Sequence, residues 1–244
     1  LNYGPNANTN RGMHLMGAYN QWGGVQNVGE CAQGHNSACT DDKGRSFVVY
    51  HTKFNDGSVG HQVRVHQLFV NEKGWLVAAP FCYRGEMEQT FTADEVVGDY
   101  HMLLHPYKLD HSNYQEQTEQ TISLTADGTV KGAYTGTWQL NGDKLTIKLG
   151  ATMYYGVVCP QHINGATTQN YKTTELAAVS FTAMAQNGVP VGGYKLEPAS
   201  AVAWNYTQHA VPVKNAQVIN SNIALMYATT DNTIKMYRSP NFSK

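Results

Sequence analysis

Apolar and polar residues alternate along most of the chain, and this alternation is typical of half-buried strands rather than helices. Between residues 35 and 83 the alternating segments are separated by short turns rich in Asn, Asp and Gly, such as Asp41-Asp42-Lys43-Gly44. Turns of this composition favour tight antiparallel hairpins. We therefore expect four consecutive strands, which together make one blade of a β-propeller. Their predicted ranges are 35–40, 46–54, 61–71 and 75–81. One further strand is expected within residues 13–22, followed by a Gly-rich turn.

A second group of alternating segments follows between about residues 96 and 197, with Gly-containing turns such as Ala126-Asp127-Gly128-Thr129. The pattern again indicates strands, and it predicts a small antiparallel β-barrel or sandwich. The clearest segments are Thr121–Leu124, Gly136–Leu140, Leu145–Leu149, Met153–Val158 and Ala178–Met184.

These patterns predict an all-β chain with three parts. Residues 1–92 hold the C-terminal part of a propeller, with its last blade at about 28–86, and residues 96–197 hold the barrel. A weaker β-rich tail, 198–244, is interpreted as a truncated Ig-like module or as strands that pack on the barrel. One blade cannot bury both faces of its sheet, and the chain has no second convincing copy of the 35–83 pattern. We therefore expect a partner polypeptide that supplies the neighbouring blades.

Composition limits the partners of the chain. Charged residues make up only 14% of the 244 residues and the net charge is -1, so no basic surface for nucleic acid is expected. No apolar run is long enough to span a membrane, and no membrane partner is expected. The four cysteines fit no zinc spacing. A disulfide between Cys31 and Cys39 is one alternative if the protein is exported, but spacing does not decide the pairing.

Three motifs carry a resemblance to a known family. They are Gly34-His35-Asn36-Ser37, the Val-Arg-Val-His-Gln run at 63–67, and the Asn-Glu-Lys-Gly-Trp-Leu-Val-Ala-Ala-Pro run at 71–80. This stretch resembles the last blade of the five-bladed propeller of glycoside hydrolase family 43 extracellular endo-α-1,5-L-arabinanases. Residues 96–197 resemble the C-terminal barrel module attached to those enzymes. The resemblance implies a secreted, extracellular or periplasmic protein.

The resemblance implies one metal ligand in this chain, His35. In the family this histidine lies at the bottom of the active cleft and contacts a calcium ion. Calcium prefers oxygen ligands, usually six to eight, so a shell made largely of water is expected around it. The catalytic carboxylates of the family lie on earlier blades, so we expect no catalytic residue here, and the substrate-binding residues stay unknown. The chain is thus expected to be one half of a split or nicked enzyme, a heterodimer with an N-terminal propeller fragment or chain.

Other residues that could carry chemistry have simpler interpretations. His61 and His66 are five positions apart on one predicted strand, so they point to opposite faces and cannot share a metal. His66 shares a face with Arg64, where polar contacts between strands are expected. Most carboxylates sit in turns, where a solvated role is the default; they are Glu30, Asp41, Asp42, Asp56, Glu72, Glu86 and Glu88.

The predicted function is inverting hydrolysis of α-1,5-linked arabinan, with calcium as cofactor and with the acid and base supplied by the partner. Such a mechanism needs two carboxyl groups about 6.5–9.5 Å apart, with a water between one of them and the sugar. One alternative is a non-catalytic carbohydrate-binding or adhesion protein that uses aromatic side chains such as Trp138, Tyr154 and Tyr155. A second alternative is another family 43 activity, arabinofuranosidase or xylosidase.

Overall fold

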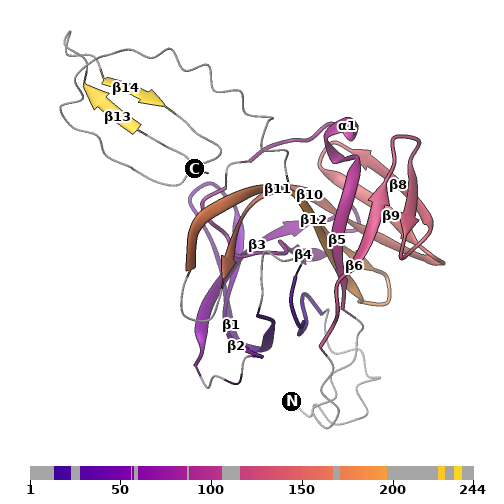
Figure 1. Cartoon of the computed structure of the whole chain (residues 1–244), viewed down its shortest axis with the longest axis horizontal. Helices are drawn as coiled ribbons and strands as arrows, with labels where there is room; N and C mark the ends of the chain where they lie inside the picture. The colour runs from indigo at the N-terminus through magenta and orange to yellow at the C-terminus, as the bar shows by residue number, and fades with distance from the viewer. Residues whose placement is uncertain are drawn as a thin grey trace.

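The computed structural model describes residues 14–22, 28–55, 57, 60–86, 88–105, 116–166, 171–196, 225–228 and 234–237. These residues form a nearly all-β molecule with one short helix, α1 (Ala93–Val96), which confirms the predicted fold class. A curled four-stranded sheet and a closed barrel lie side by side (Figure 1). The sheet contains β1 (Glu30–Thr40), β2 (Ser46–Phe54), β3 (Gln62–Val70) and β4 (Leu76–Ala78). The barrel contains β5 (Gly98–Leu104), β6 (Gln120–Leu124), β7 (Thr129–Gly132), β8 (Gly136–Asn141), β9 (Lys144–Leu149), β10 (Thr152–Ala166), β11 (Tyr171–Ala185) and β12 (Pro190–Leu196).

The four strands of the sheet are neighbours in sequence order and all pair antiparallel. The turns that join them are stabilised in the same way. Asp41 accepts hydrogen bonds on Oδ1 from the backbone N–H groups of Lys43 and Arg45, at 3.0 and 2.8 Å. In the β3–β4 turn, Asn71 accepts two equivalent bonds at 3.0 Å each. Asx side chains that bind their own turn explain why these hairpins could be predicted from sequence. The first strand begins at Glu30, five residues earlier than the predicted strand.

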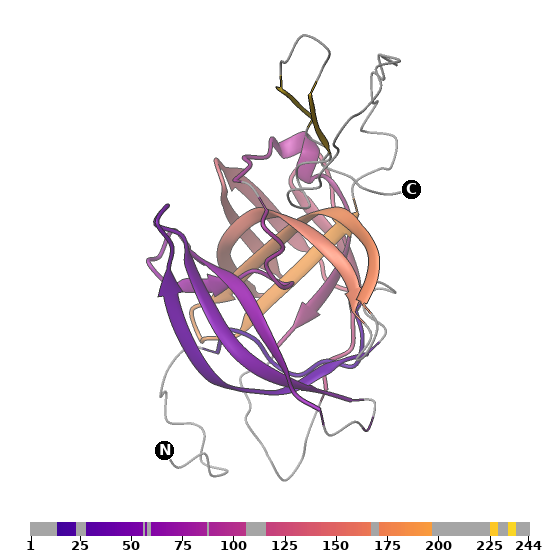
Figure 2. The same cartoon turned by 90° about the vertical axis from the view of Figure 1, so that its left-hand side faces the viewer.

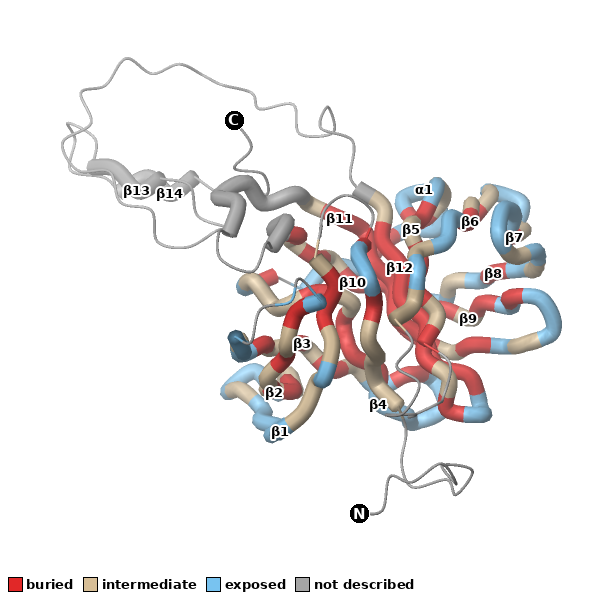
Figure 3. Tube along the Cα trace, turned by 60° about the horizontal axis from the view of Figure 1, so that its bottom comes forward, coloured by how far each residue is buried: buried red, intermediate tan, exposed pale blue. Residues whose placement is uncertain are grey.

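The barrel is closed, with the strand order β10-β11-β12-β5-β6-β7-β8-β9. Its interior is filled by side chains from every strand, and Figure 3 shows buried stretches of β10, β11 and β12 in red. Gly193 is required in this packing, because a Cβ at that position would lie 2.4 Å from the ring of Phe181. Trp138 and Tyr154, two of the aromatic residues considered for sugar stacking, belong to this core with exposed fractions of 7% and 4%.

The sheet and the barrel are joined through buried contacts, and Figure 2 shows the curled sheet in front of the barrel. Val77 of β4 packs with Val157 of β10 and Met184 of β11. The carboxamide of Gln161 accepts from the backbone N–H of Phe81 at 2.7 Å and donates to its carbonyl at 2.9 Å. These paired bonds leave no unsatisfied polar group in the peptide of Phe81, so they fix the blade end against the barrel wall.

The segment 14–22 lies between the two parts. A strand was predicted within 13–22, but the described residues 14–22 form only isolated bridges, one of them between Tyr19 and Gln117, so that expectation is wrong. Trp22 is instead buried against Phe81, with ring centroids 4.7 Å apart.

In the tail, only the hairpin of β13 (Leu225–Ala228) and β14 (Ile234–Tyr237) belongs to the described residues, so the Ig-like interpretation of 198–244 lies outside them. None of the helices found in the described residues is both long and apolar enough to cross a membrane.

Candidate functional site

His35 is placed by an irregular stretch of β1. The register between β1 and β2 shifts twice, between Cys31 and Gly34 and again between Gly34 and Ser37. Both Ala32 and His35 have positive φ angles, 52° and 46°, a conformation uncommon for residues other than glycine. Bulges of this kind re-aim a side chain at the edge of a sheet. Here the result is an exposed imidazole on an edge strand.

Two further histidines continue a row that starts at His35: His51 lies on β2, and His61 immediately precedes β3. The ring centroids of His35 and His51 are 4.9 Å apart, and those of His51 and His61 are 4.8 Å apart. Desolvation, followed by the neighbouring His61 and His35, lowers the pKa of His51. We refer to His35, His51 and His61 as the histidine row. Sequence reasoning missed it because the contact between His35 and His51 depends on the bulged register.

The described residues supply only a small part of a metal site. No group of three or more His, Cys, Asp or Glu side chains among them is arranged to hold a metal ion. The group that lies beside His35 is the imidazole of His51, a nitrogen ligand, whereas calcium prefers oxygen. The residues described here therefore do not make a calcium site by themselves. The assignment of His35 as a metal ligand and of calcium as cofactor stays a prediction.

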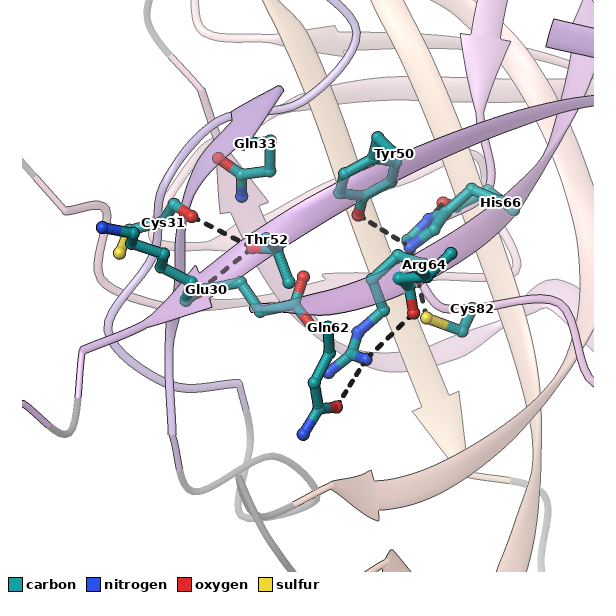
Figure 4. Close-up of polar contacts among 12 residues, drawn as sticks. Glu30, Cys31, Gln33, Tyr50, Thr52, Gln62, Arg64, His66 and Cys82 are labelled. Atoms are coloured by element: carbon teal, nitrogen blue, oxygen red, sulfur yellow. Dashed lines mark hydrogen bonds and ion pairs between the residues drawn. The ribbon is translucent and has the colours of Figure 1, made fainter. Parts of the chain in front are cut away.

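The opposite, inner face of the sheet carries a buried polar network (Figure 4). The carboxylate of Glu30 pairs with Nε of Arg64 at 2.8 Å, and both side chains are about 5% exposed. Arg64 also donates from Nη1 to the carboxamide of Gln62 at 2.8 Å. The polar contact predicted for Arg64 on this face is therefore confirmed, with a partner that sequence reasoning had left among the turn carboxylates.

His66 occupies the same inner face and is fully enclosed. Its Nδ1–H donates to the carbonyl of Ala79 at 2.7 Å, so Nε2 accepts from the hydroxyl of Tyr50 at 3.0 Å. Burial lowers the pKa of His66, with partial opposition from the Ala79 hydrogen bond. A neutral, doubly bonded imidazole is a structural element here.

The cysteines add no cross-link. Cys31, Cys39, Cys82 and Cys159 are all free thiols, so the Cys31–Cys39 alternative is not formed. Burial raises the pKa of Cys82 to about 12, which keeps that thiol protonated and unreactive.

The carboxylates of the sheet and linker are engaged in structural roles or exposed. Asp41 pairs with Arg45 at 2.7 Å within its own turn. Glu86 is buried and accepts hydrogen bonds from the backbone N–H groups of Arg84 and His162, at 2.7 and 2.9 Å. Asp42, Glu72 and Glu88 are exposed, and Asp56 lies outside the described residues. Asp42, Glu72 and Glu88 agree with the predicted solvated role, whereas the buried Glu30 and Glu86 do not.

The fold defines the class of protein. It is an all-β module in which a closed eight-stranded barrel follows a curled four-stranded sheet. Residues 80–193 match the family described as the C-terminal lipocalin-like domain of glycoside hydrolase family 43. The chain carries that domain, and it resembles the C-terminal portion of the extracellular endo-α-1,5-L-arabinanases of the family.

Two curated relatives support the assignment. The chain is 36% identical over 174 residues to an extracellular endo-α-(1→5)-L-arabinanase of Thermotoga petrophila, which covers 69% of this chain and 35% of the relative. It is 37% identical over 155 residues to extracellular endo-α-(1→5)-L-arabinanase 2 of Bacillus subtilis, which covers 62% of this chain and 32% of the relative. The chain thus spans roughly a third of the length of these relatives.

Solved structures give the same result. The family 43 YxiA protein of Bacillus licheniformis superimposes with a TM-score of 0.66 and 32% identity, over 77% of this chain and 40% of that protein. The endo-1,5-α-L-arabinanase of Thermotoga petrophila RKU-1 superimposes with a TM-score of 0.66 and 31% identity, over 77% and 41%.

Proposed function

We propose that this chain is the C-terminal part of an extracellular family 43 endo-arabinanase that cleaves α-1,5-linked arabinan with inversion. It contributes the last propeller blade and the barrel, and an N-terminal propeller fragment or chain contributes the catalytic carboxylates. The observation that carries the proposal is the uncovered outer face of the sheet. Val49 of β2 lies opposite Val65 of β3, and His51 lies opposite Val63, whose side chain is 68% exposed.

We call Val49, His51, Val63 and Val65 the outer face. Valine on a sheet normally packs against another element, and a solvent-facing apolar patch of this kind marks an interaction surface. The adjoining edge strand is also uncovered, since residues 35–40 of β1 are all exposed. In a propeller both surfaces have partners: the face packs on the preceding blade and the inner strand lines the central channel. The relatives named as arabinanases are about three times longer than the matched part, at 35% and 32% coverage, which provides the length for those blades.

Within this proposal His35 is the one protein ligand from this chain to a calcium ion in the cleft. The bound cation would favour ionisation of a carboxyl group nearby. The bulged backbone leaves the imidazole of His35 exposed on the edge strand, which would line the channel of an assembled propeller. The remaining ligands would be water or partner oxygen atoms.

The test is a reconstitution. The chain is assayed alone and with an N-terminal propeller chain, and the release of reducing ends from linear arabinan is measured. We expect no cleavage by the chain alone and cleavage by the mixture. Normal cleavage by residues 1–244 alone as a monomer would refute the split arrangement.

The metal is tested on the assembled enzyme. Calcium content, measured by elemental analysis, is expected to fall in His35→Ala and to stay unchanged in the matched variant His61→Ala at the far end of the histidine row. Unchanged calcium in His35→Ala would remove the ligand assignment.

A further inference from the structure

A groove of about 670 Å³ runs along the junction between the sheet and the barrel. It is lined by the end of β3 and the start of β4, by the linker residues Glu86, Glu88, Gln89 and Thr90, and by Val158, Cys159 and Pro160 of β10. Small-molecule sites are often found between domains and have volumes of about 300–1,000 Å³. The groove belongs entirely to this chain, so its properties do not depend on a partner.

The sides of the groove are held together by polar contacts between the two domains. Lys144 of β9 donates to the carbonyl of Val70 at 3.0 Å, and Asn71 donates to the carbonyl of Tyr155 at 2.9 Å. On the linker side, Glu86 accepts from the backbone N–H of His162. A site held in this way is formed before a ligand arrives, which lowers the entropic cost of binding.

Two kinds of surface meet in the lining. Gln67 and Gln89 bring carboxamides for which the described part of the chain offers no hydrogen-bond partner, and Thr90 adds a hydroxyl. Beside them lies the half-buried ring of Phe69, which is two positions from Gln67 on β3 and therefore shares its face of the strand.

The charges around the groove argue against an ionic ligand. Arg45 is already paired with Asp41 at 2.7 Å, and Asp143 with Lys144 at 2.8 Å. The remaining acids of the lining, Glu86 and Glu88, disfavour an anion, and no cluster suited to a cation occurs in the described residues. A neutral ligand with many hydroxyl groups fits better. Carboxamides both donate to and accept from hydroxyls, and the C–H face of a sugar ring packs on an aromatic ring.

We propose that this groove is a non-catalytic binding site for a neutral oligosaccharide, and that it holds a segment of the arabinan chain away from the catalytic cleft. The identity of the sugar rests on the proposed function, whereas the site itself rests on the groove. Gln67 and Gln89 bind the hydroxyls, and the aromatic ring of Phe69 supports the sugar ring.

The experiment is isothermal titration calorimetry, in which the 244-residue chain is titrated with arabinopentaose. Xylopentaose is the comparison sugar. We expect arabinopentaose to bind and the double variant Gln67→Ala/Gln89→Ala to bind at least about tenfold more weakly, since two hydrogen bonds are lost. The matched control is Gln139→Ala, an exposed carboxamide on β8 outside the groove. Thermal unfolding of all three proteins checks that the fold is unchanged.

Two results would overturn the proposal: no binding of either pentaose by the unaltered chain, or equal binding by the chain and the double variant. Binding of xylopentaose alone would keep the site and change the sugar. The reconstitution assay is independent of this result. Binding at the groove without cleavage by the mixture would reject the proposed function only, and cleavage without binding would reject the groove only.

Discussion

The barrel and the four-stranded sheet are both antiparallel, but they have opposite relations to solvent. In the barrel every strand has two hydrogen-bonded neighbours, and Tyr100, Met102 and Phe181 have exposed fractions of 0%. In the sheet, β1 has one neighbour, and Val63 on the outer face is 68% exposed. Closure therefore makes the barrel self-sufficient, whereas the sheet is complete on its inner face only. The exposed outer face of the sheet is the surface that the partner in our proposed function would cover.

The largest effect is expected in the barrel. Phe181→Ala removes a fully buried ring that packs against Tyr100, with ring centroids 5.4 Å apart, and leaves a cavity between two strands. We expect a loss of about 3–5 kcal/mol in the free energy of unfolding, measured by urea denaturation. Phe181→Leu keeps most of the volume and should cost less. A loss below about 1 kcal/mol in the alanine variant would show that the barrel is not the stable half of the molecule.

The inner face of the sheet is expected to come next. Glu30→Ala leaves Arg64 buried without its carboxylate, and breaking a buried ion pair costs about 3–5 kcal/mol. We expect the lower end, about 3 kcal/mol by urea denaturation, because Arg64 keeps its bond to Gln62. The paired replacement Glu30→Leu/Arg64→Met removes both charges and should recover much of the loss. No recovery would mean that packing, not charge, sets the effect.

The same contrast explains what could be predicted from the sequence. Turn chemistry is local, so Asp41 and Asn71 revealed the hairpins of the sheet, and alternation revealed most barrel strands. The strand predicted within 13–22 does not form, because the apolar residues of 14–22 pack into the junction between the sheet and the barrel without pairing as a strand.

The candidate site was only partly predictable. The motif around His35 identified β1 as a strand of the candidate site, but the contact between His35 and His51 depends on two register shifts. Glu30 looked like a turn acid because its partner Arg64 is distant in sequence and meets it only across the folded sheet. Contacts that depend on long-range register leave little signal in one sequence.

A third effect should appear at the junction as the pH falls. His105 is buried beside His14, and burial lowers the pKa of His105 from its usual 6.5 to about 3. In the unfolded chain the imidazole of His105 binds a proton below pH 6.5, whereas in the folded chain it stays neutral until about pH 3. Stability from this residue is thus full above pH 6.5 and is lost as the pH falls toward 3, by about 1.4 kcal/mol for each pH unit.

Urea denaturation at pH 7.5 and 5.5 measures this loss. We expect the unaltered chain to lose about 1.4 kcal/mol from His105 over this interval, and His105→Leu to lose correspondingly less. Gln139→Ala, at an exposed position of β8 that carries no titratable group, is the control and should retain the full pH dependence of the unaltered chain. If the unaltered chain and His105→Leu lose the same free energy of unfolding between pH 7.5 and 5.5, a group other than His105 causes the acid sensitivity.

The smallest effect should come from the outer face, and it separates the two regions most sharply. Val63→Ala removes methyl groups that already contact water, so the free energy of unfolding of the chain alone should change by less than about 0.5 kcal/mol. If the outer face packs on a neighbouring blade, the same substitution removes buried surface from that interface. The affinity for an N-terminal propeller chain, measured by titration calorimetry, should then fall about tenfold, since two methyl groups contribute about 1.5 kcal/mol when buried. An unchanged affinity would mean that the exposed valines do not mark the interface, because a residue that is neutral alone must become costly once its surface is covered.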